Sequence, residues 1–223
     1  MNNEFNEKTY SKKMPVDGVD FFRFNFILSN IEDNNKDILD LGCWDGSYAK
    51  RYSKTTNKVY GIESSITAAR KAKENGIMVE HGYFPSSNLF PDRKFDYIIA
   101  GEIIEHVFDT DLFLNSIKDK LKDDGLLIIT TPNVASLPRR ILLLLGINPI
   151  LDFRAIDNVA GHIRYFTFKN LKMLLEENGF KVTKQKSDVL NFNNKGTFYS
   201  RFVPKFHKEF GRSIMMCAKK ISN

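Results

Sequence analysis

The stretch Ile38-Leu39-Asp40-Leu41-Gly42-Cys43-Trp44-Asp45-Gly46-Ser47 determines how the rest of the chain is interpreted. Its apolar run contains one acid and is followed by two glycines four residues apart. This pattern predicts a buried strand that turns tightly into a helix. Glycine suits such a turn because it adopts unusual backbone angles and lets a ligand approach the main chain closely. Residues 37–41 are therefore predicted to form a strand that ends at a ligand-binding turn.

A second apolar segment, Val59-Tyr60-Gly61-Ile62, ends in Glu63, 21 residues after Gly42. An acid at the end of the next strand, about 20 residues on, is the position at which a Rossmann-like sheet binds ribose hydroxyls. The chain lacks the three-glycine spacing G-x-G-x-x-G that a nicotinamide cofactor would require. The turn and the acid together predict a ribose-containing cofactor of another kind.

Further strands and helices alternate along the chain. Strands are predicted over 37–41, 58–62, 77–80, 95–100 and 125–131, and helices over 46–54, 65–75 and 110–121. A leading amphipathic helix over 21–28, a helix over 169–178 and two late strands over 180–189 and 213–218 complete the prediction. Strands that alternate with helices predict an α/β fold, a parallel sheet with helices on both faces.

Five segments, in order across residues 36–133, resemble the class I S-adenosylmethionine-dependent methyltransferases. They are Asp40-Leu41-Gly42-Cys43-Trp44-Asp45-Gly46, Gly61-Ile62-Glu63, Phe95-Asp96-Tyr97-Ile98-Ile99, Glu102-Ile103-Ile104-Glu105-His106-Val107 and Leu121–Thr130. The resemblance implies a Rossmann-like seven-stranded mixed sheet, parallel with an antiparallel last strand. It also implies bound S-adenosylmethionine and methyl transfer, and a single methyltransferase domain over residues 1–223.

The cofactor is expected at the carboxyl ends of the first, second and fourth strands, where parallel sheets bind ligands. Asp40, Gly42 and Gly46 should shape the turn near the methionine part, Glu63 should bind the ribose, and Gly101 lies at the end of the fourth strand. The sequence at 81–84 is His-Gly-Tyr-Phe, where many relatives have an acid for the adenine amine. Adenine is therefore expected to contact an aromatic ring or backbone groups.

A second constellation combines Glu102, Glu105 and His106 with His162. If residues 102–106 form a helical turn, the two glutamates share one face and His106 lies beside them. Carboxylate oxygens suit Mg or Mn, and imidazole nitrogens admit Zn or Fe. The four residues are therefore candidate ligands of a divalent cation, with Glu105 and His106 as candidate catalytic residues.

This constellation resembles two methyltransferase groups. The ubiquinone-biosynthesis O-methyltransferases share the Glu-x-x-Glu-His run, and the small-RNA 3′-terminal 2′-O-methyltransferases share a motif similar to His162-Ile163-Arg164-Tyr165-Phe166-Thr167. In both, the resemblance implies a metal that holds adjacent hydroxyls of a catechol or a ribose. Without a metal, His106 would act as a general base or cap a helix, and His162 would anchor the segment before the helix cap at Thr167.

The composition is that of a globular protein, with 42% hydrophobic and 27% charged residues. The first eight residues contain no apolar signal-peptide core, no apolar run is long enough to span a bilayer, and two cysteines make no disulfide framework. A cytoplasmic protein is therefore expected. Residues 181–223 carry a charge of +8, against −2 for the rest. This basic, aromatic segment is either a solvated surface or faces a phosphate-bearing substrate, an anionic membrane or nucleic acid.

Residues 134–161 are expected to form an insertion or lid on the substrate side, whereas residues 1–35 form a helical lead. Within the insertion, Arg139-Arg140 precede the apolar run 141–151, which is too short to cross a bilayer. The run is interpreted as a lid over an apolar substrate, as a peripheral membrane contact through residues 139–151, or as an ordinary packed helix.

Three functions follow from the sequence. The first is O-methylation of a small or lipid-linked acceptor with neighbouring hydroxyls, such as a sugar, a glycan precursor or a quinone-type phenol. The second is RNA 2′-O-methylation, which the basic segment and the His162 motif favour. The third is a non-catalytic S-adenosylmethionine-binding regulatory protein. The cofactor set of Gly42, Gly46 and Glu63 favours an enzyme over the third function.

Overall fold

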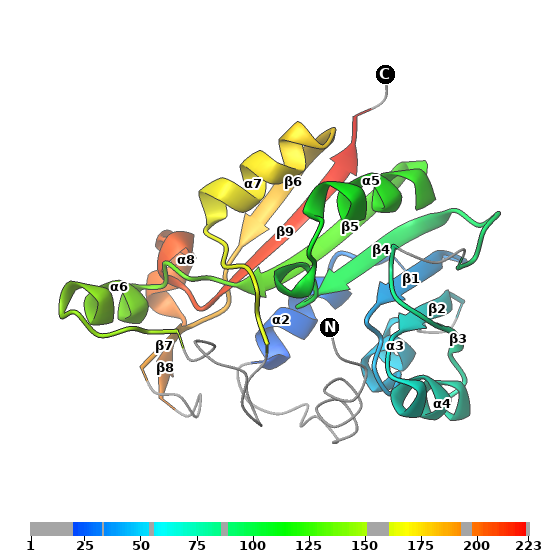
Figure 1. Ribbon diagram of the computed structural model, residues 1–223, viewed down its shortest axis with the longest axis horizontal. Helices are drawn as coiled ribbons and strands as arrows, with labels where there is room; N and C mark the ends of the chain where they lie inside the picture. Colours follow the sequence, from blue (N-terminus) through cyan, green and yellow to red (C-terminus); the bar gives the residue numbers. More distant parts are fainter. Residues whose placement is uncertain are drawn as a thin grey trace.

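The computed structural model describes residues 20–32, 34–53, 56–85, 89–150, 161–192 and 198–221. Within these residues seven strands form one mixed sheet in the order β3-β2-β1-β4-β5-β9-β6 (Figure 1). The strands are β1 (Asp37–Leu41), β2 (Lys58–Glu63), β3 (Met78–His81), β4 (Phe95–Gly101), β5 (Leu121–Pro132), β6 (Phe180–Lys186) and β9 (Ser213–Lys220). β1 to β5 pair in parallel, and β9 is antiparallel to β5 and β6. The predicted mixed sheet with an antiparallel last strand is confirmed.

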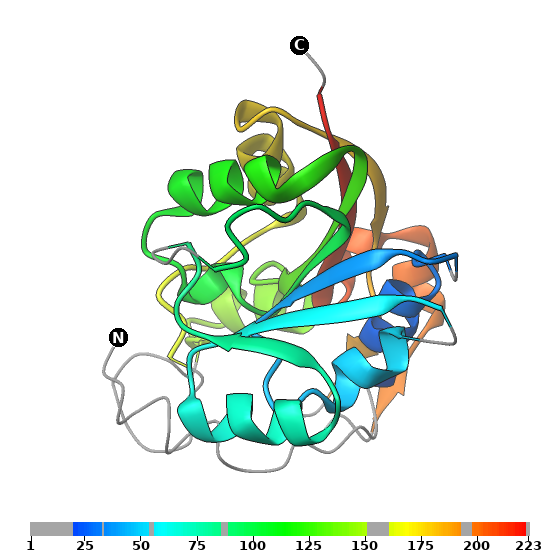
Figure 2. The same ribbon diagram turned by 90° about the vertical axis from the view of Figure 1, so that its right-hand side faces the viewer.

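Helices cover both faces of the sheet (Figures 1 and 2). One face carries α2 (Asp20–Leu28), α3 (Ser47–Tyr52) and α4 (Ile66–Glu74), and the other carries α5 (Thr110–Lys120) and α7 (Phe168–Glu177). Consecutive strand residues belong to opposite sides: Ile98 packs in the core beneath α5 and α7, and Ile99 in the core beneath α2 and α3. A strand buried on both faces must be apolar at successive positions, which explains the continuous apolar runs in the sequence.

The chain order of the strands reverses between β1 and β4. From β1 the chain runs outward to β2 and β3, and then returns to add β4 and β5 on the other side. In open parallel sheets, ligands bind beyond the carboxyl ends of the strands at this reversal. Gly42, which follows β1, and Gly101, the last residue of β4, both lie there.

Some elements differ from those that the sequence predicts. β5 begins at Leu121 rather than at residue 125, and it pairs with Phe95 before a register irregularity. α6 (Leu137–Leu144) begins before the predicted run 141–151, because Pro138 occupies the first turn, where proline is favoured. The small strands β7 (Leu190–Asn191) and β8 (Tyr199–Ser200) and the helix α8 (Phe202–Phe206) were not predicted.

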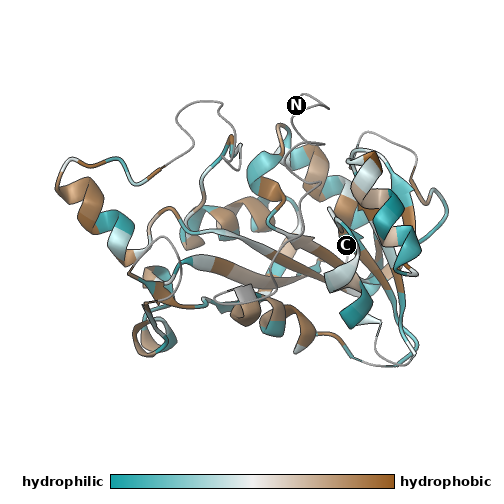
Figure 3. Cartoon of the chain, turned by 90° about the horizontal axis from the view of Figure 1, so that it is seen from below, coloured by the Kyte–Doolittle hydropathy of each residue, from teal (hydrophilic) through white to brown (hydrophobic). Residues whose placement is uncertain are grey.

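α6 lies at one end of the protein and projects beyond the sheet (Figures 1 and 3). It follows β5 within the predicted insertion. Residues 1–19 and 33 of the predicted N-terminal lead, and residues 151–160 of the insertion, lie outside the described residues. Among the helices described, none has the length and apolar character needed to cross a bilayer.

Candidate functional site

The turn after β1 places two glycines in left-handed backbone conformations. Gly42 and Gly46 have φ angles of +69° and +75°. Gly42 is exposed, and a side chain there would meet only Ile103, at 3.4 Å. Gly46 is buried, and a side chain there would come within 2.9 Å of Ile77 and 3.1 Å of Ala72. Gly42 therefore leaves the backbone open to a ligand, whereas Gly46 lets α3 pack closely against its neighbours.

Glu63, at the end of β2, ties the turn to the next helix. Its Oε2 accepts a hydrogen bond of 2.9 Å from the Trp44 amide, and its Oε1 accepts one of 2.8 Å from the Ser65 amide. Trp44 has φ +48°, so its amide faces this carboxylate from a left-handed conformation. Burial raises the pKa of Glu63, although these amide hydrogen bonds oppose the shift. The carboxylate is thus fixed beside the glycine turn, at the position expected to bind ribose.

Asp40 lies beneath the same turn, buried in β1. Burial and the nearby charge of Glu63 raise its pKa to about 8. At neutral pH its carboxyl group is therefore mostly protonated and adds little negative charge to the cofactor turn.

Cys43 fills the space above β2 and leaves no room for a side chain at Gly61. A Cβ at Gly61 would lie only 2.4 Å from Cys43 Sγ. Both cysteines, Cys43 and Cys217, are buried and free, as the sequence predicts. Burial raises the pKa of each thiol, so neither is activated as a nucleophile.

A second group gathers at the ends of β4 and β5. Glu105 and His106 belong to a 3-10 turn, Ile104–His106, and His162 comes from the segment that precedes α7. One ligand atom from each of these three residues lies within 4.8 Å of the other two. His162 Nε2 is 3.9 Å from Glu105 Oε1, and the two imidazole rings are 4.9 Å apart between centroids. The structure thus brings together residues that lie 57 positions apart in the sequence.

Main-chain hydrogen bonds hold this group in place. The Glu105 carbonyl accepts hydrogen bonds from the amides of Ile163, at 3.0 Å, and Arg164, at 3.2 Å. The Arg164 guanidinium donates to the carbonyls of Val107 and Phe108, just beyond the turn. His106 Nδ1 lies 3.3 Å from the Gly161 carbonyl. The segment 161–164 is therefore attached directly to the turn that carries Glu105 and His106.

Glu105 has two differently placed carboxylate oxygens. Oε2 accepts a hydrogen bond of 2.9 Å from Thr131 Oγ1, and Oε1 has no hydrogen-bond partner among the described residues, although it is buried. The side chain is 1% exposed. Burial, and then the charge of Glu102, raise the pKa of Glu105 well above its usual range. A buried carboxylate oxygen of this kind requires a proton or a cation as its partner.

Glu102 does not join the group. It has φ +56°, and the 3-10 turn begins two residues later, so the expected helical face shared with Glu105 does not form. Its carboxylate accepts from Thr130 Oγ1 at 3.0 Å and pairs with Arg23 of α2 at 3.1 Å. Thr130 and Thr131 are consecutive in β5 and face opposite sides of the sheet. The two glutamates are therefore drawn toward opposite faces.

The remaining candidates lie elsewhere or have other partners. Gly101 ends β4, and a side chain there would meet nothing closer than Thr130 Oγ1 at 3.8 Å. His81 ends β3 and hydrogen-bonds the Ser64 carbonyl, whereas His207 follows α8. In the 81–84 stretch, Phe84 packs edge-on against Phe113, and Tyr83 is 38% exposed. Tyr83 therefore presents more ring surface for adenine than Phe84 does.

Sequence reasoning missed three residues of this region. Arg23 lies among the aromatic residues of α2, and Thr130 and Thr131 end the apolar run of β5. Two hydroxyls at the end of a buried strand are a readable signal for polar partners at the sheet edge. No local sequence pattern indicates the ion pair between Arg23 and Glu102, because the residues are 79 positions apart.

Comparisons with known proteins agree with this geometry. A family model described as a methyltransferase domain matches residues 16–185. The ubiquinone biosynthesis O-methyltransferase of Pelagibacter ubique (strain HTCC1062) is 31% identical over 163 residues, 71% of this chain and 66% of that protein. That of Chelativorans sp. (strain BNC1) is 33% identical over 101 residues, 43% of this chain and 40% of that protein. In both matches the chain covers less than two thirds of the relative's length.

Solved structures share the fold at low sequence identity. A possible histamine N-methyltransferase from Thermotoga maritima has a TM-score of 0.60 at 20% identity, covering 91% of each chain. A magnesium protoporphyrin IX methyltransferase from Synechocystis PCC 6803, solved with bound SAH, has a TM-score of 0.60 at 14% identity, covering 91% of this chain and 81% of that one. The family match covers most of the chain, and the sheet and glycine turn agree with it. The chain therefore belongs to the methyltransferase domain family.

Proposed function

We propose that this enzyme methylates a hydroxyl oxygen on a small or lipid-linked acceptor that carries a neighbouring hydroxyl. A sugar, a glycan precursor or a quinone-type phenol would meet this description. The proposal is carried by one observation: Glu105 Oε1 is buried beside His106 and His162, without a hydrogen-bond partner among the described residues. The names of the curated relatives, ubiquinone biosynthesis O-methyltransferases, support oxygen as the methylated atom.

The group of three residues fits a divalent cation. It offers one carboxylate oxygen and two imidazole nitrogens, a set that suits Zn or Fe and admits Mg or Mn. Thr131 engages Glu105 Oε2 and so leaves Oε1 for the cation. The Gly161 carbonyl beside His106 Nδ1 would orient that ring, as outer hydrogen bonds do for metal-binding histidines. Glu102 contributes its charge from the neighbouring position rather than a ligand atom in this arrangement.

Some residues of the site would position the cofactor and the acceptor, and others would help to remove the proton of the acceptor hydroxyl. A bound cation would lower the pKa of an acceptor hydroxyl and so favour its deprotonated form at neutral pH. With a cation bound, the nitrogens of His106 would be used by the cation and by the Gly161 carbonyl, so His106 would serve as the general base only without a cation. Gly42, Gly46, Gly101 and Glu63 would hold the cofactor with its methyl directed at the acceptor oxygen. In-line placement of the two reacting atoms would supply much of the rate.

The insertion after β5 is proposed to cover the acceptor. Residues 134–150 leave the sheet beside the Glu105 group, and their run of leucines would suit an apolar acceptor. For a lipid-linked acceptor, residues 139–151 would contact the membrane. RNA 2′-O-methylation remains the second candidate, and RNA retention that falls steeply with salt would support it instead.

The test is calorimetric titration of chelator-treated protein with Mn²⁺ and with Zn²⁺. Glu105→Gln is expected to weaken cation binding at least about ten-fold. Glu102→Gln is the matched control, because it makes the same change in a carboxylate that pairs with Arg23. We expect the control to stay within about three-fold of the natural protein. His162→Ala and His207→Ala form a second matched pair with the same expected contrast.

Methyl transfer to a catechol and to its singly methylated form completes the test. A diol requirement predicts turnover of the catechol alone, lost in Glu105→Gln. Equal cation affinities for Glu105→Gln and the natural protein would contradict the metal assignment. Turnover that proceeds without any bound cation would leave His106 as the sole base.

A further inference from the structure

α6 is unusual because none of its residues is buried. Ile141 is 49% exposed, and most of the other exposed apolar side chains lie at the end of the helix and in the turn that follows: Leu143 is 57% exposed, Leu144 85%, Leu145 67% and Ile147 51%. Figure 3 shows the helix at one end of the protein, with its hydrophobic end farthest from the body. Such a cluster of large exposed apolar residues marks an interaction site.

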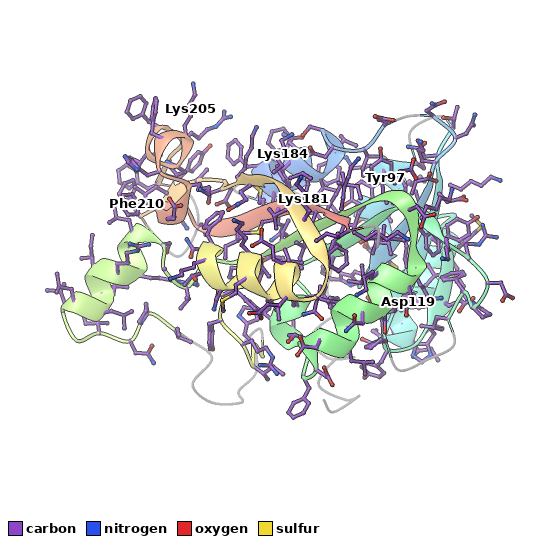
Figure 4. All side chains as sticks on the ribbon, turned by 90° about the horizontal axis from the view of Figure 1, so that it is seen from above. Tyr97, Asp119, Lys181, Lys184, Lys205 and Phe210 are labelled. Atoms are coloured by element: carbon purple, nitrogen blue, oxygen red, sulfur yellow. The ribbon has the colours of Figure 1, made fainter. Side chains whose placement is uncertain are left out.

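α8 carries a second pair of exposed apolar side chains at the same end of the protein. Phe202 and Phe206 are 72% and 64% exposed, and their rings contact each other at 5.1 Å between centroids. Arg140 of α6 lies 5.2 Å over the Phe210 ring, which connects α6 with the turn that follows α8. Figures 1 and 4 both show α6 beside α8 at the same end of the protein. We call Leu143, Leu144, Leu145, Ile147, Phe202 and Phe206 the α6–α8 surface.

The two segments that carry these side chains are basic. Residues 133–150 contain Arg139 and Arg140 and no acid, and residues 198–208 contain Arg201, Lys205 and Lys208 and no acid. Lys205 is exposed and points outward from α8 (Figure 4). The nearest acid in sequence, Glu209, pairs with Lys208 at 3.0 Å. Exposed leucines and phenylalanines bordered by cations are typical of proteins that lie in a membrane interface.

We propose that the α6–α8 surface binds the interface of a membrane that contains anionic phospholipids. The leucines and phenylalanines enter the boundary between headgroups and acyl chains, and the cations contact the lipid phosphates. A second copy of the chain fits less well, because it would bring like charges together around the apolar residues. The inference deepens the proposed function: it rests on the lipid-linked acceptor, which the bound membrane would present to the site.

The experiment measures binding of the full chain to sedimented vesicles. One set contains equal parts of phosphatidylglycerol and phosphatidylcholine, and the other contains phosphatidylcholine alone. We expect binding to the anionic vesicles that weakens as salt is added, and at least about ten-fold weaker binding to the neutral ones. Binding no stronger to anionic vesicles than to neutral ones would overturn the proposal.

Two variants and a control test whether the α6–α8 surface is the part of the protein that binds vesicles. Leu144→Asp should weaken binding at least about ten-fold, and Lys205→Glu about three-fold to ten-fold. Leu112→Asp is the matched control, because Leu112 is 53% exposed on α5, away from α6 in Figures 1 and 4. The control should bind as the natural protein does. Equal binding by Leu144→Asp and Leu112→Asp would exclude the α6–α8 surface.

Two further measurements separate the possible failures. Size-exclusion chromatography detects self-association: a dimer that Leu144→Asp separates, with no vesicle binding, would make the surface a contact between copies. Turnover of a water-soluble catechol by Lys205→Glu should match the natural protein, because Lys205 lies on α8, outside the segment 134–150 that is proposed to cover the acceptor. Vesicle binding without methyl transfer to any diol would contradict the proposed reaction, but it would still support membrane binding by the α6–α8 surface.

Discussion

Two buried glutamates at the same edge of the sheet differ in how their oxygens are used. Glu63, at the cofactor turn, is 5% exposed, and each of its carboxylate oxygens accepts a hydrogen bond from a main-chain amide. Glu105, across the edge, is 1% exposed, and Oε1 lacks a hydrogen-bond partner among the described residues. Burial raises the pKa of both groups, but only Glu63 has amide donors around both oxygens to oppose it.

This difference indicates which half of the site is complete without a ligand and which half needs one. The cofactor half is assembled by the chain itself, because the Trp44 and Ser65 amides fix Glu63 before any ligand binds. The acceptor half has an oxygen whose burial is costly until a proton or a cation meets it. We therefore expect changes at Glu63 to affect cofactor affinity and stability, and changes at Glu105 to affect cation binding and turnover.

The largest effect should come from replacing each of the two glutamates by glutamine in turn. Glu63→Gln places an amide group against two main-chain N–H donors, so one hydrogen bond is lost and a donor is left buried. We expect S-adenosylmethionine affinity to fall about ten-fold to thirty-fold, measured by calorimetry. Glu105→Gln should leave this affinity within about two-fold. Equal losses in both variants would contradict the division.

A smaller effect concerns Asp40, whose pKa of about 8 depends on burial and on the charge of Glu63. Between pH 4 and 8 the unfolded chain loses this proton while the folded protein keeps it, so stability falls as pH rises through this range. Asp40→Asn removes that dependence. Relative to the natural protein, it should gain about 1.3 kcal/mol for each pH unit between pH 5 and pH 7.

Urea unfolding at the two pH values measures the Asp40 prediction. The same comparison in a Glu63→Gln background should give a smaller gain, because one cause of the raised pKa is then absent. Parallel pH profiles for Asp40→Asn and the natural protein would contradict a protonated Asp40.

The smallest effect should come from the Arg23–Glu102 ion pair, whose side chains are 14% and 25% exposed. Arg23→Met leaves the Glu102 charge partly buried with Thr130 still donating to it, so we expect a loss of about 1 kcal/mol in unfolding free energy. A cycle with Glu102→Gln should show coupling of about 0.5–1 kcal/mol by urea unfolding. Cation affinity that rises more than about ten-fold in Arg23→Met would instead indicate that Glu102 can join Glu105 as a ligand.

The sequence predicted the half of the site that depends on local chemistry. The Gly42 turn, Glu63 and the strands β1 to β4 are read from apolar runs, glycines and an acid at a strand end. The group of Glu105, His106 and His162 was anticipated through a motif, and the structure brings these residues together. Whether they bind a cation stays a prediction.

Other features could not be read from the sequence because they depend on backbone conformation and long-range contacts. The left-handed φ of Glu102 is rare for a residue with a side chain, and it separates Glu102 from the helical turn. The Arg23–Glu102 ion pair joins distant segments. Pro138 indicates the early start of α6, whereas the apolar run 141–151 alone indicates a later one.

Cys43 and Gly61 impose a constraint on how this chain can diverge. Since the Cys43 sulfur occupies the space that a Cβ at position 61 would need, position 61 can gain a side chain only if position 43 loses its sulfur. A lineage that acquires alanine at position 61 must first replace Cys43 by a residue without the sulfur, such as alanine or glycine, or shift β2 away from the cofactor turn. The two positions should therefore covary among descendants of this sequence, and a relative with alanine at 61 and cysteine at 43 is expected to show a displaced Glu63.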